Sequence, residues 1–151
     1  GTGATAEKQL LYPYRVCLYY LSGQFSKSVE SAVTWARMNP SNEIGLVWAA
    51  SAMRRALGTQ EVRALVDRLQ IQDAYCEAVA NLLADRLSEA ELRDAFPNHS
   101  YDTECYLGEA WVDRDKVRAL AHWRKCMETS SVQTFEYLRS FRNYADAVGY
   151  N

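Results

Sequence analysis

The sequence contains little glycine and proline, and this shortage bears on its fold class. Seven Gly and three Pro among 151 residues provide too few turn signals for a β-sandwich or barrel, where turns recur about every 8 to 12 residues. We therefore exclude an all-β fold. A hydrophobic content of 48% with 24% charged residues is typical of a folded globular protein, and the length fits a single domain.

The chain also lacks an excess of basic charge and lacks long apolar runs. Seventeen Lys and Arg stand against nineteen Asp and Glu, for a net charge of -2, which excludes a dedicated nucleic-acid binder. No apolar run approaches the roughly 18 residues that a transmembrane segment needs. Residues 1–8 are predicted to be disordered or left by processing or cloning, so a lipid anchor is compatible with the chain only if it was lost from the N-terminus.

Motifs for catalysis are missing as well. The chain has no GxSxG, no P-loop and no HExxH, and His99 and His122 are its only histidines. We expect a protein that is not an enzyme and that carries no cofactor. The four cysteines show no CxxC and no dense spacing, so they do not form a disulfide framework, and each is expected to act as a small buried hydrophobe.

Apolar residues recur at helical spacing along almost the whole chain, which predicts an all-α fold. Short breaks between the helices require antiparallel neighbours. Gly58 suits a helix end, Ser88 with Glu91 predicts a capping box, and Ser130 with Gln133 is a second candidate. The nine predicted helices span 9–22, 25–38, 42–57, 59–70, 72–86, 88–96, 102–113, 115–129 and 132–148.

An internal repeat is present at an offset of 91 residues. In each copy a bulky and then a small residue precede an aromatic residue, and a second small residue follows eight positions later. The aligned pairs are Val16 with Leu107, Cys17 with Gly108, Tyr20 with Trp111, Ser28 with Ala119, Ala32 with Trp123, and Trp35 with Cys126.

This is the tetratricopeptide (TPR) pattern, in which small side chains let paired helices cross closely while aromatics fill the space between them. The predicted fold is a right-handed superhelical stack of antiparallel helical hairpins, a TPR-like solenoid of about nine helices. Residues 9–151 form one domain, with hairpins at about 10–40, 42–70, 72–97 and 102–131 and a capping helix at 132–148.

The segment from Leu10 to Gly149 resembles the C-terminal half of the NlpI-type TPR lipoproteins of the bacterial outer membrane. The resemblance rests on LYYLSGQFSKSVE at 18–30, ANLLADRLSEAELRDAF at 80–96 and CYLGEAWVDRDKVRALAHW at 105–123. It implies a periplasmic or outer-membrane-associated scaffold for peptidoglycan hydrolases and proteases. The repeats through which that family dimerises are absent here.

In a TPR hairpin, the residues of the first helix that do not pack on the second line a concave groove. Such a groove, apolar at one end and acidic at the other, suits a peptide with an apolar anchor and basic flanks. The alternative is that a neighbouring helix covers these residues. The predicted partner-binding residues are Leu11, Tyr14, Leu18 and Leu21 in the first copy and Asp102, Cys105, Glu109, Val112 and Asp113 in the second.

Charge and aromatics suggest two further surfaces. Residues 73–115 carry a net charge of -8 and residues 116–151 a net charge of +3, which reflects either solvated helix faces or an acidic surface for a basic partner. The last helix offers Tyr137, Arg139, Arg142 and Tyr144 as a partner or dimer patch, and simple covering of the final hairpin is the alternative.

The repeat register argues against a metal site. His122 and Cys126 are four residues apart and could share a metal with Cys105 or His99. The register, however, points Cys126 into the hairpin and Cys105 to the opposite side, so no metal is expected, and His122 is placed at the surface or at an interface. A Cys–His nucleophile fails on the same ground, because Cys126 would be buried.

We expect a non-enzymatic scaffold or adaptor that binds protein or peptide partners, with homodimer formation left open. The alternative is a cytoplasmic TPR module such as a secretion chaperone or regulator, which unpaired cysteines would favour. An enzyme built on helical repeats is the third hypothesis.

Overall fold

The computed structural model describes residues 2–39, 43–129 and 135–149. Across these ranges the chain is helical throughout, with nine α-helices, one short 3-10 helix at Pro97–His99 and no strand, which confirms the predicted all-α class. The α-helices are α1 (Thr2–Leu21), α2 (Phe25–Met38), α3 (Ile44–Leu57), α4 (Thr59–Arg68), α5 (Ala74–Leu83), α6 (Glu89–Ala95), α7 (Ser100–Trp111), α8 (Lys116–Thr129) and α9 (Phe135–Ala147).

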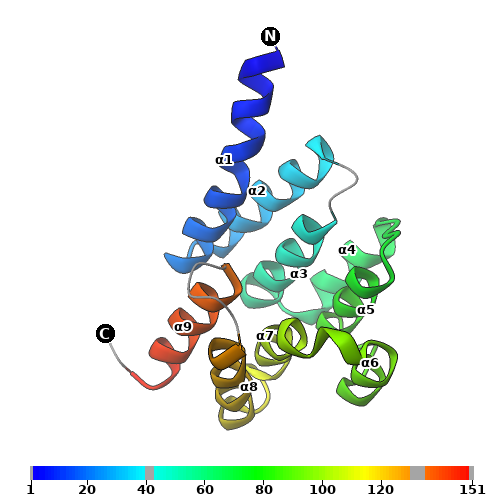
Figure 1. The fold of residues 1–151 in the computed structure, drawn as a ribbon, viewed down its shortest axis with the longest axis vertical. Helices are drawn as coiled ribbons and strands as arrows, with labels where there is room; N and C mark the ends of the chain where they lie inside the picture. The colour runs from blue at the N-terminus through cyan, green and yellow to red at the C-terminus, as the bar shows by residue number, and fades with distance from the viewer. Residues whose placement is uncertain (1, 40–42, 130–134, 150–151) are drawn as a thin grey trace. The chain divides into compact units, whose positions relative to one another are not determined.

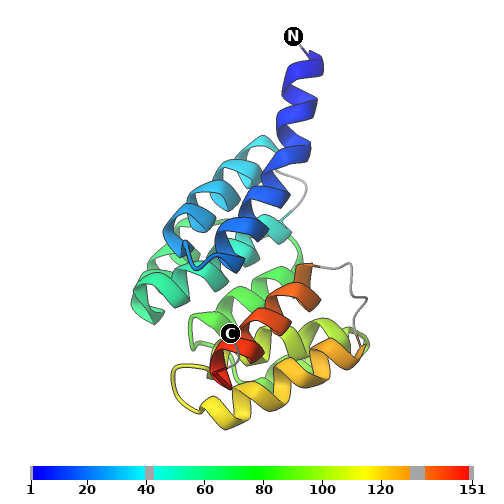
Figure 2. The same cartoon turned by 90° about the vertical axis from the view of Figure 1, so that its left-hand side faces the viewer.

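The helices group into two compact units, where the sequence analysis treated residues 9–151 as one domain. The first unit spans Gly1–Ala84 and the second Asp85–Asn151. In the first unit α1 packs on α2, α2 on α3, and α3 on both α4 and α5 (Figure 1). In the second, α7 packs on α8, and α9 lies beside α8 and also contacts α7 (Figure 2).

The repeat seen in the sequence is a repeat of helix boundaries. Helices α2 and α8 each contain 14 residues, and they begin and end 91 residues apart. Two of the paired packing positions are fully buried in both copies, Val16 with Leu107 and Ser28 with Ala119, all 0% exposed. The Ser28 hydroxyl donates a hydrogen bond of 2.9 Å to the Val16 carbonyl, so a small residue brings α2 close to the α1 backbone.

Glycine permits a second close approach, between α7 and α8. A Cβ atom added at Gly108 would overlap the indole of Trp123, with Nε1 and Cδ1 as the nearest atoms. In the first unit, a Cβ at Gly45 would lie 2.8 Å from Cε3 of Trp35. In each unit the absence of a side chain on one helix makes room for a tryptophan on its neighbour.

Several helix ends follow the expected local chemistry. Gly58 ends α3 with a φ of +98°, in the region that favours glycine. Ser88 and Glu91 form the predicted capping box at the start of α6. The candidate cap at Ser130 and Gln133 lies outside the described residues. Helix α1 begins at Thr2, seven residues before the predicted start.

Two arginines hold the end of α5. Arg54 Nη1 donates to the Leu83 carbonyl at 2.7 Å, and Arg63 Nε donates to the Ala84 carbonyl at 2.7 Å. Carbonyl groups at the end of a helix have no hydrogen-bond partner within that helix. The arginine side chains from α3 and α4 supply these partners, so they hold the end of α5 against both helices. Among the described residues, none of the helices is both long enough and apolar enough to span a bilayer.

Candidate interaction surface

An apolar ridge runs along one side of α1. Leu11, Tyr14 and Leu18 are 51%, 68% and 64% exposed, and their spacing of three and four residues places them on one helix face. The opposite face packs against α2 through the buried Val16 and Tyr20. We call Leu11, Tyr14 and Leu18 the α1 ridge. All three were predicted partner-binding residues, and the fourth of that set, Leu21, is half-buried.

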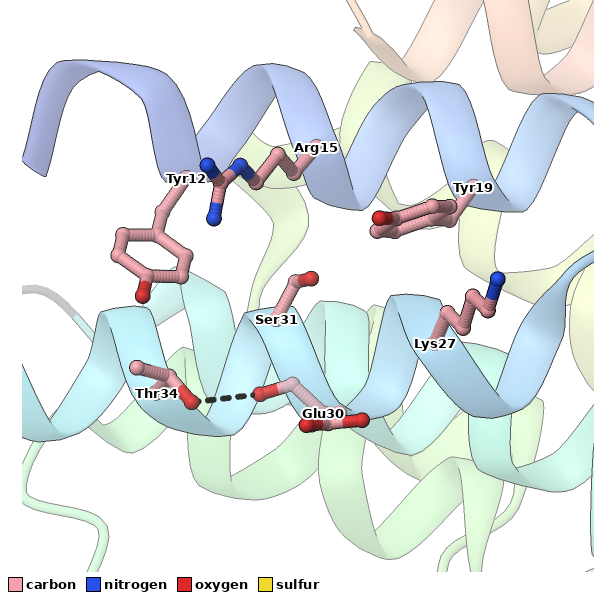
Figure 3. A pocket seen from close by; sticks show the side chains of 7 residues that line it. All are labelled: Tyr12, Arg15, Tyr19, Lys27, Glu30, Ser31 and Thr34. Atoms are coloured by element: carbon pink, nitrogen blue, oxygen red, sulfur yellow. Dashed lines mark hydrogen bonds between the residues drawn. The ribbon is translucent and has the colours of Figure 1, made fainter. Parts of the chain in front are cut away.

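A polar pocket of about 240 Å³ lies between α1 and α2, next to the ridge. Figure 3 shows the side chains of Tyr12, Arg15 and Tyr19 from α1 facing those of Lys27 and Ser31 from α2. The remaining lining residues are Glu30 and Thr34, and the Thr34 hydroxyl donates to the Glu30 carbonyl at 2.9 Å. Sequence reasoning missed this pocket because its residues come from two helices and form no motif.

Both cations of this pocket lie over aromatic rings. The Arg15 guanidinium carbon is 5.2 Å from the centre of the Tyr12 ring, and Lys27 Nζ is 5.7 Å from that of Tyr19. Within the described ranges, neither Arg15 nor Lys27 forms an ion pair with a carboxylate. Two positive charges against the one carboxylate of Glu30 give the pocket a net positive character.

The second predicted half of the groove is largely closed. Cys105 and Glu109 are both 0% exposed, whereas Asp102 and Val112 are half-buried and Asp113 is exposed. The expectation that Cys105 and Glu109 line an accessible groove is therefore corrected. The alternative left open by the sequence, cover by a neighbouring helix, applies to Glu109.

Helix α9 supplies that cover. Arg139 is 0% exposed, and its Nε lies 3.5 Å from Glu109 Oε1. Asn143 Nδ2 donates to the same oxygen at 3.0 Å, and the Arg139 guanidinium lies over the Tyr106 ring at 4.9 Å. The Glu109 carboxylate was expected to contact a basic partner, and it contacts a basic residue of the same chain.

The residues of the predicted C-terminal patch likewise differ in their exposure. Arg139 is buried against α7, so it cannot contribute to a surface. Arg142 is exposed and pairs with Asp146 four residues later at 3.1 Å, and Tyr144 is half-buried. The side chain of Tyr137 lies outside the described part of the structure.

Cys105 and Cys126 form a disulfide that joins α7 to α8, with a Cα–Cα separation of 5.0 Å. The sequence analysis placed the two side chains on opposite sides of the hairpin and expected no disulfide, and both expectations are wrong. Both side chains are fully buried between α7 and α8, so Cys105 faces α8 and not an open groove. Cys17 is half-buried and Cys76 is buried, and neither is in a disulfide.

An ionic cluster centred on the buried Glu104 and His122 lies beside the disulfide. His122 Nδ1 donates to Glu104 Oε2 at 2.6 Å, and Arg93 Nη2 donates to Glu104 Oε1 at 2.7 Å. On its other side, His122 Nε2 lies 3.1 Å from Glu89 Oε1, an ion-pair contact, and Arg118 reaches Glu89 Oε2 at 3.2 Å. His122 is only 7% exposed, so of the two predicted positions, surface or interface, the exposed surface is wrong.

The cluster favours an ionised Glu104. Burial by itself raises the pKa of this carboxyl, but the hydrogen bonds from His122 and Arg93 outweigh burial and bring the pKa below its ordinary value. The contacts join α6, α7 and α8 through side chains alone. We assign the cluster a structural role, because it holds three helices of the second unit together.

Two features of the described residues bear on metal binding and on thiol reactivity. No group of three or more His, Cys, Asp or Glu among them is arranged to hold a metal ion. Burial, followed by the nearby charge of Asp73, raises the pKa of the Cys76 thiol to about 12, which leaves almost no thiolate at neutral pH. Two of the features that face solvent are the α1 ridge and the cationic pocket.

No protein-family model, curated protein or solved structure matches the chain. The resemblance to NlpI-type lipoproteins therefore stays a prediction, carried by the sequence segments at 18–30, 80–96 and 105–123. Function is argued from the geometry of the chain itself.

Proposed function

We propose that this protein is a non-enzymatic interaction scaffold that binds a protein or peptide partner along α1. The observation that carries the proposal is the α1 ridge, three large side chains at helical spacing that are each more than half exposed. Contiguous apolar surface of this kind marks interaction sites in soluble proteins. Burying one such side chain completely contributes about 1.5–3 kcal/mol, so three anchors can support specific binding.

The pocket beside the ridge indicates the charge of the partner. Arg15 and Lys27 carry two positive charges at the edge of the apolar contact, and charged rims select partners by complementarity. The proposed partner therefore has an apolar anchor with acidic flanks. This reverses the basic flanks expected from the sequence, since Glu109 is already paired with Arg139.

The disulfide supports an extracytoplasmic setting. Structural disulfides persist in oxidising compartments and are rare in the cytosol, and Cys105–Cys126 joins two core helices. This favours the envelope scaffold suggested by the NlpI-type resemblance over a cytoplasmic TPR module, because that alternative relied on unpaired cysteines. TPR-type stacking of the hairpins is part of the same proposal, as is the chemical character of the partner.

A peptide-display selection tests the proposal. A random peptide library is selected on the full chain, and the enriched peptides are then tested on the ridge variant Tyr14→Ser/Leu18→Ser. The matched control is Val117→Ser, which removes a 78% exposed apolar side chain from α8. We expect the enriched peptides to lose binding to the ridge variant and to keep binding to the control. Failure to enrich any peptide, or equal binding to both variants, would contradict the scaffold function.

The same selection also tests the predicted charge of the partner. Peptides enriched on the unchanged chain should combine apolar residues with Asp or Glu. A selection repeated on Arg15→Gln/Lys27→Gln should still enrich apolar residues and should lose the acidic ones. Acidic residues enriched equally on both proteins would contradict the role of the pocket while leaving docking on the ridge intact.

A further inference from the structure

A second cavity lies in the first unit, on the other side of α2 from the α1 pocket. Its volume is about 440 Å³, within the range of small-molecule sites, about 300–1,000 Å³. Helix α3 packs against both α2 and α4, whereas α2 and α4 do not contact each other within the described chain. Helix α3 lies between α2 and α4 (Figure 1). The cavity is lined by side chains of all three helices, so α3 forms the floor of a groove and α2 and α4 form its walls.

The interior of this groove is apolar. Its side chains come from all three helices and from the residue that follows α4, and nearly all are half-buried, which leaves part of each surface uncovered. A concave apolar surface with a few polar groups is the usual form of a ligand site. The apolar lining residues are Val33, Ala36, Leu46, Met53, Leu65 and Leu69.

Two arginines lie at the rim of the groove. Arg37 is in the last turn of α2 and Arg68 in the last turn of α4. Arg68 Nε donates to the Ala64 carbonyl of its own helix at 3.2 Å, which leaves its terminal nitrogens as further donors. Neither guanidinium is within ion-pair distance of a carboxylate among the residues described.

The one carboxylate of the groove is already engaged. Glu43 Oε2 accepts from the Gln72 backbone N–H at 2.7 Å, and Oε1 accepts from that of Asp73 at 2.6 Å. Both oxygens therefore hold the chain at the start of α5. Arg37 and Arg68 have no comparable contact with a carboxylate. The charge at the rim that is not balanced by a nearby partner is therefore positive.

We propose that the α2–α3–α4 groove binds a small anionic amphiphile, with its apolar chain over α3 and its acidic head between Arg37 and Arg68. The apolar side chains supply the burial that favours the tail. Two guanidinium groups supply charge-assisted hydrogen bonds for a carboxylate or a similar oxyanion. This site is separate from the α1 ridge and does not depend on the proposed scaffold function.

Decanoate is the probe for this site, and decyltrimethylammonium and decanol are matched probes with the same tail and a different head. Calorimetric titration of the full chain, below the micelle concentrations, should give one decanoate per chain. We expect decanoate to bind about tenfold more tightly than decyltrimethylammonium, the ratio expected when a charged head gains hydrogen bonds that the cation cannot make. Equal binding of the two ions, or no binding of decanoate, would overturn the proposal.

Variants and a site-specific signal locate the bound probe. Arg37→Gln/Arg68→Gln should abolish the preference for decanoate, whereas Arg124→Gln, an exposed arginine of α8, should preserve it. With methionine methyl groups labelled for NMR, decanoate should shift the Met53 signal and leave that of Met127 in α8 in place. A preference that survives the double variant, or an unshifted Met53, would show that decanoate binds elsewhere.

Ridge variants and peptides separate this site from the docking surface. Tyr14→Ser/Leu18→Ser should bind decanoate as the unchanged chain does, because neither residue lines the groove. If peptides enriched on the ridge shift Met53 and decanoate does not, the groove belongs to the protein partner and the amphiphile proposal is wrong.

Discussion

At the scale of single residues, the contact between Gly108 and Trp123 sets how closely α7 and α8 approach. A methyl group at position 108 would overlap the five-membered ring of Trp123. We expect Gly108→Ala to lower the free energy of unfolding by about 1–3 kcal/mol, the usual cost of overpacking, as measured by urea denaturation. Trp123→Phe removes the overlapping ring, so Gly108→Ala should cost less in that background. An equal cost in both backgrounds would contradict the proposed overlap.

Glu104 makes the stability of the second unit depend on pH. Its pKa is lowered in the folded state, so its contribution is complete above its unfolded pKa, about 4.3, and is lost as pH falls through the lower folded value. Glu104→Gln should lower the free energy of unfolding near pH 7 by about 1–3 kcal/mol, since it weakens hydrogen bonds to charged partners.

The pH series identifies the cause of that loss. The difference between the unchanged chain and Glu104→Gln should narrow as pH falls below about 4, because the native carboxyl then becomes protonated as well. Glu128→Gln is the control, since the side chain of Glu128 is 61% exposed and pairs with the exposed surface residue Arg124, and it should change stability by less than about 0.5 kcal/mol. A difference independent of pH would argue against an ionised Glu104.

Cys76 should be chemically inert in the folded chain. Burial and the charge of Asp73 raise the pKa of its thiol to about 12, and the thiolate is the reactive form. Iodoacetamide at neutral pH should label the half-buried Cys17 first and reach Cys76 only when the protein unfolds. Mass spectrometry of tryptic peptides measures both sites. Rapid labelling of native Cys76 would contradict its burial.

At the scale of elements, the disulfide fastens α7 to α8. Closing a loop with a sequence separation of 21 residues stabilises a domain by about 3 kcal/mol in the chain-entropy description. Cys105→Ala/Cys126→Ala should therefore lose about 2–4 kcal/mol in urea denaturation, and reducing agent should destabilise the unchanged chain in the same sense.

Thiol counting checks the same disulfide independently of stability. The chain has four cysteines, of which Cys105 and Cys126 are bonded. Denatured but unreduced protein should expose two titratable thiols, and reduction should expose all four. Four thiols before reduction would contradict the disulfide and remove its support for an extracytoplasmic setting.

Helix boundaries were more predictable from the sequence than side-chain partners. Helix α2 was predicted at 25–38 and found at Phe25–Met38, and α8 was predicted at 115–129 and found at Lys116–Thr129. Apolar periodicity and turn residues are local signals, so they suffice for such boundaries. The early start of α1 was missed because its first turns carry no apolar periodicity.

The predicted site residues show the same difference between local signals and contacts with distant helices. The α1 ridge was predicted from the sequence of a single helix. Its residues are exposed because, within the described chain, α2 packs against the opposite face of α1. Glu109 was misplaced because its environment depends on α9, thirty residues further along the chain. The cationic pocket and the α2–α3–α4 groove depend on contacts between helices, which no single segment encodes.

At the scale of the whole molecule, the two charged stretches of the sequence pair with each other at three carboxylates of the second unit. Glu89 pairs with Arg118, Glu109 with Arg139, and Glu104 with His122. Part of the uneven charge of the sequence is therefore balanced within the chain. Uncompensated positive charge lies in the first unit instead, beside the α1 ridge and at the rim of the groove.

Site-specific photo-crosslinking tests whether a partner docks along α1. A benzophenone amino acid is placed at Leu18 on the ridge, which is 64% exposed, or at Val117 in α8, which is 78% exposed. With a peptide enriched on the unchanged chain, we predict crosslinking from position 18 and none from position 117. Crosslinking from position 117 with none from position 18 would contradict docking along α1.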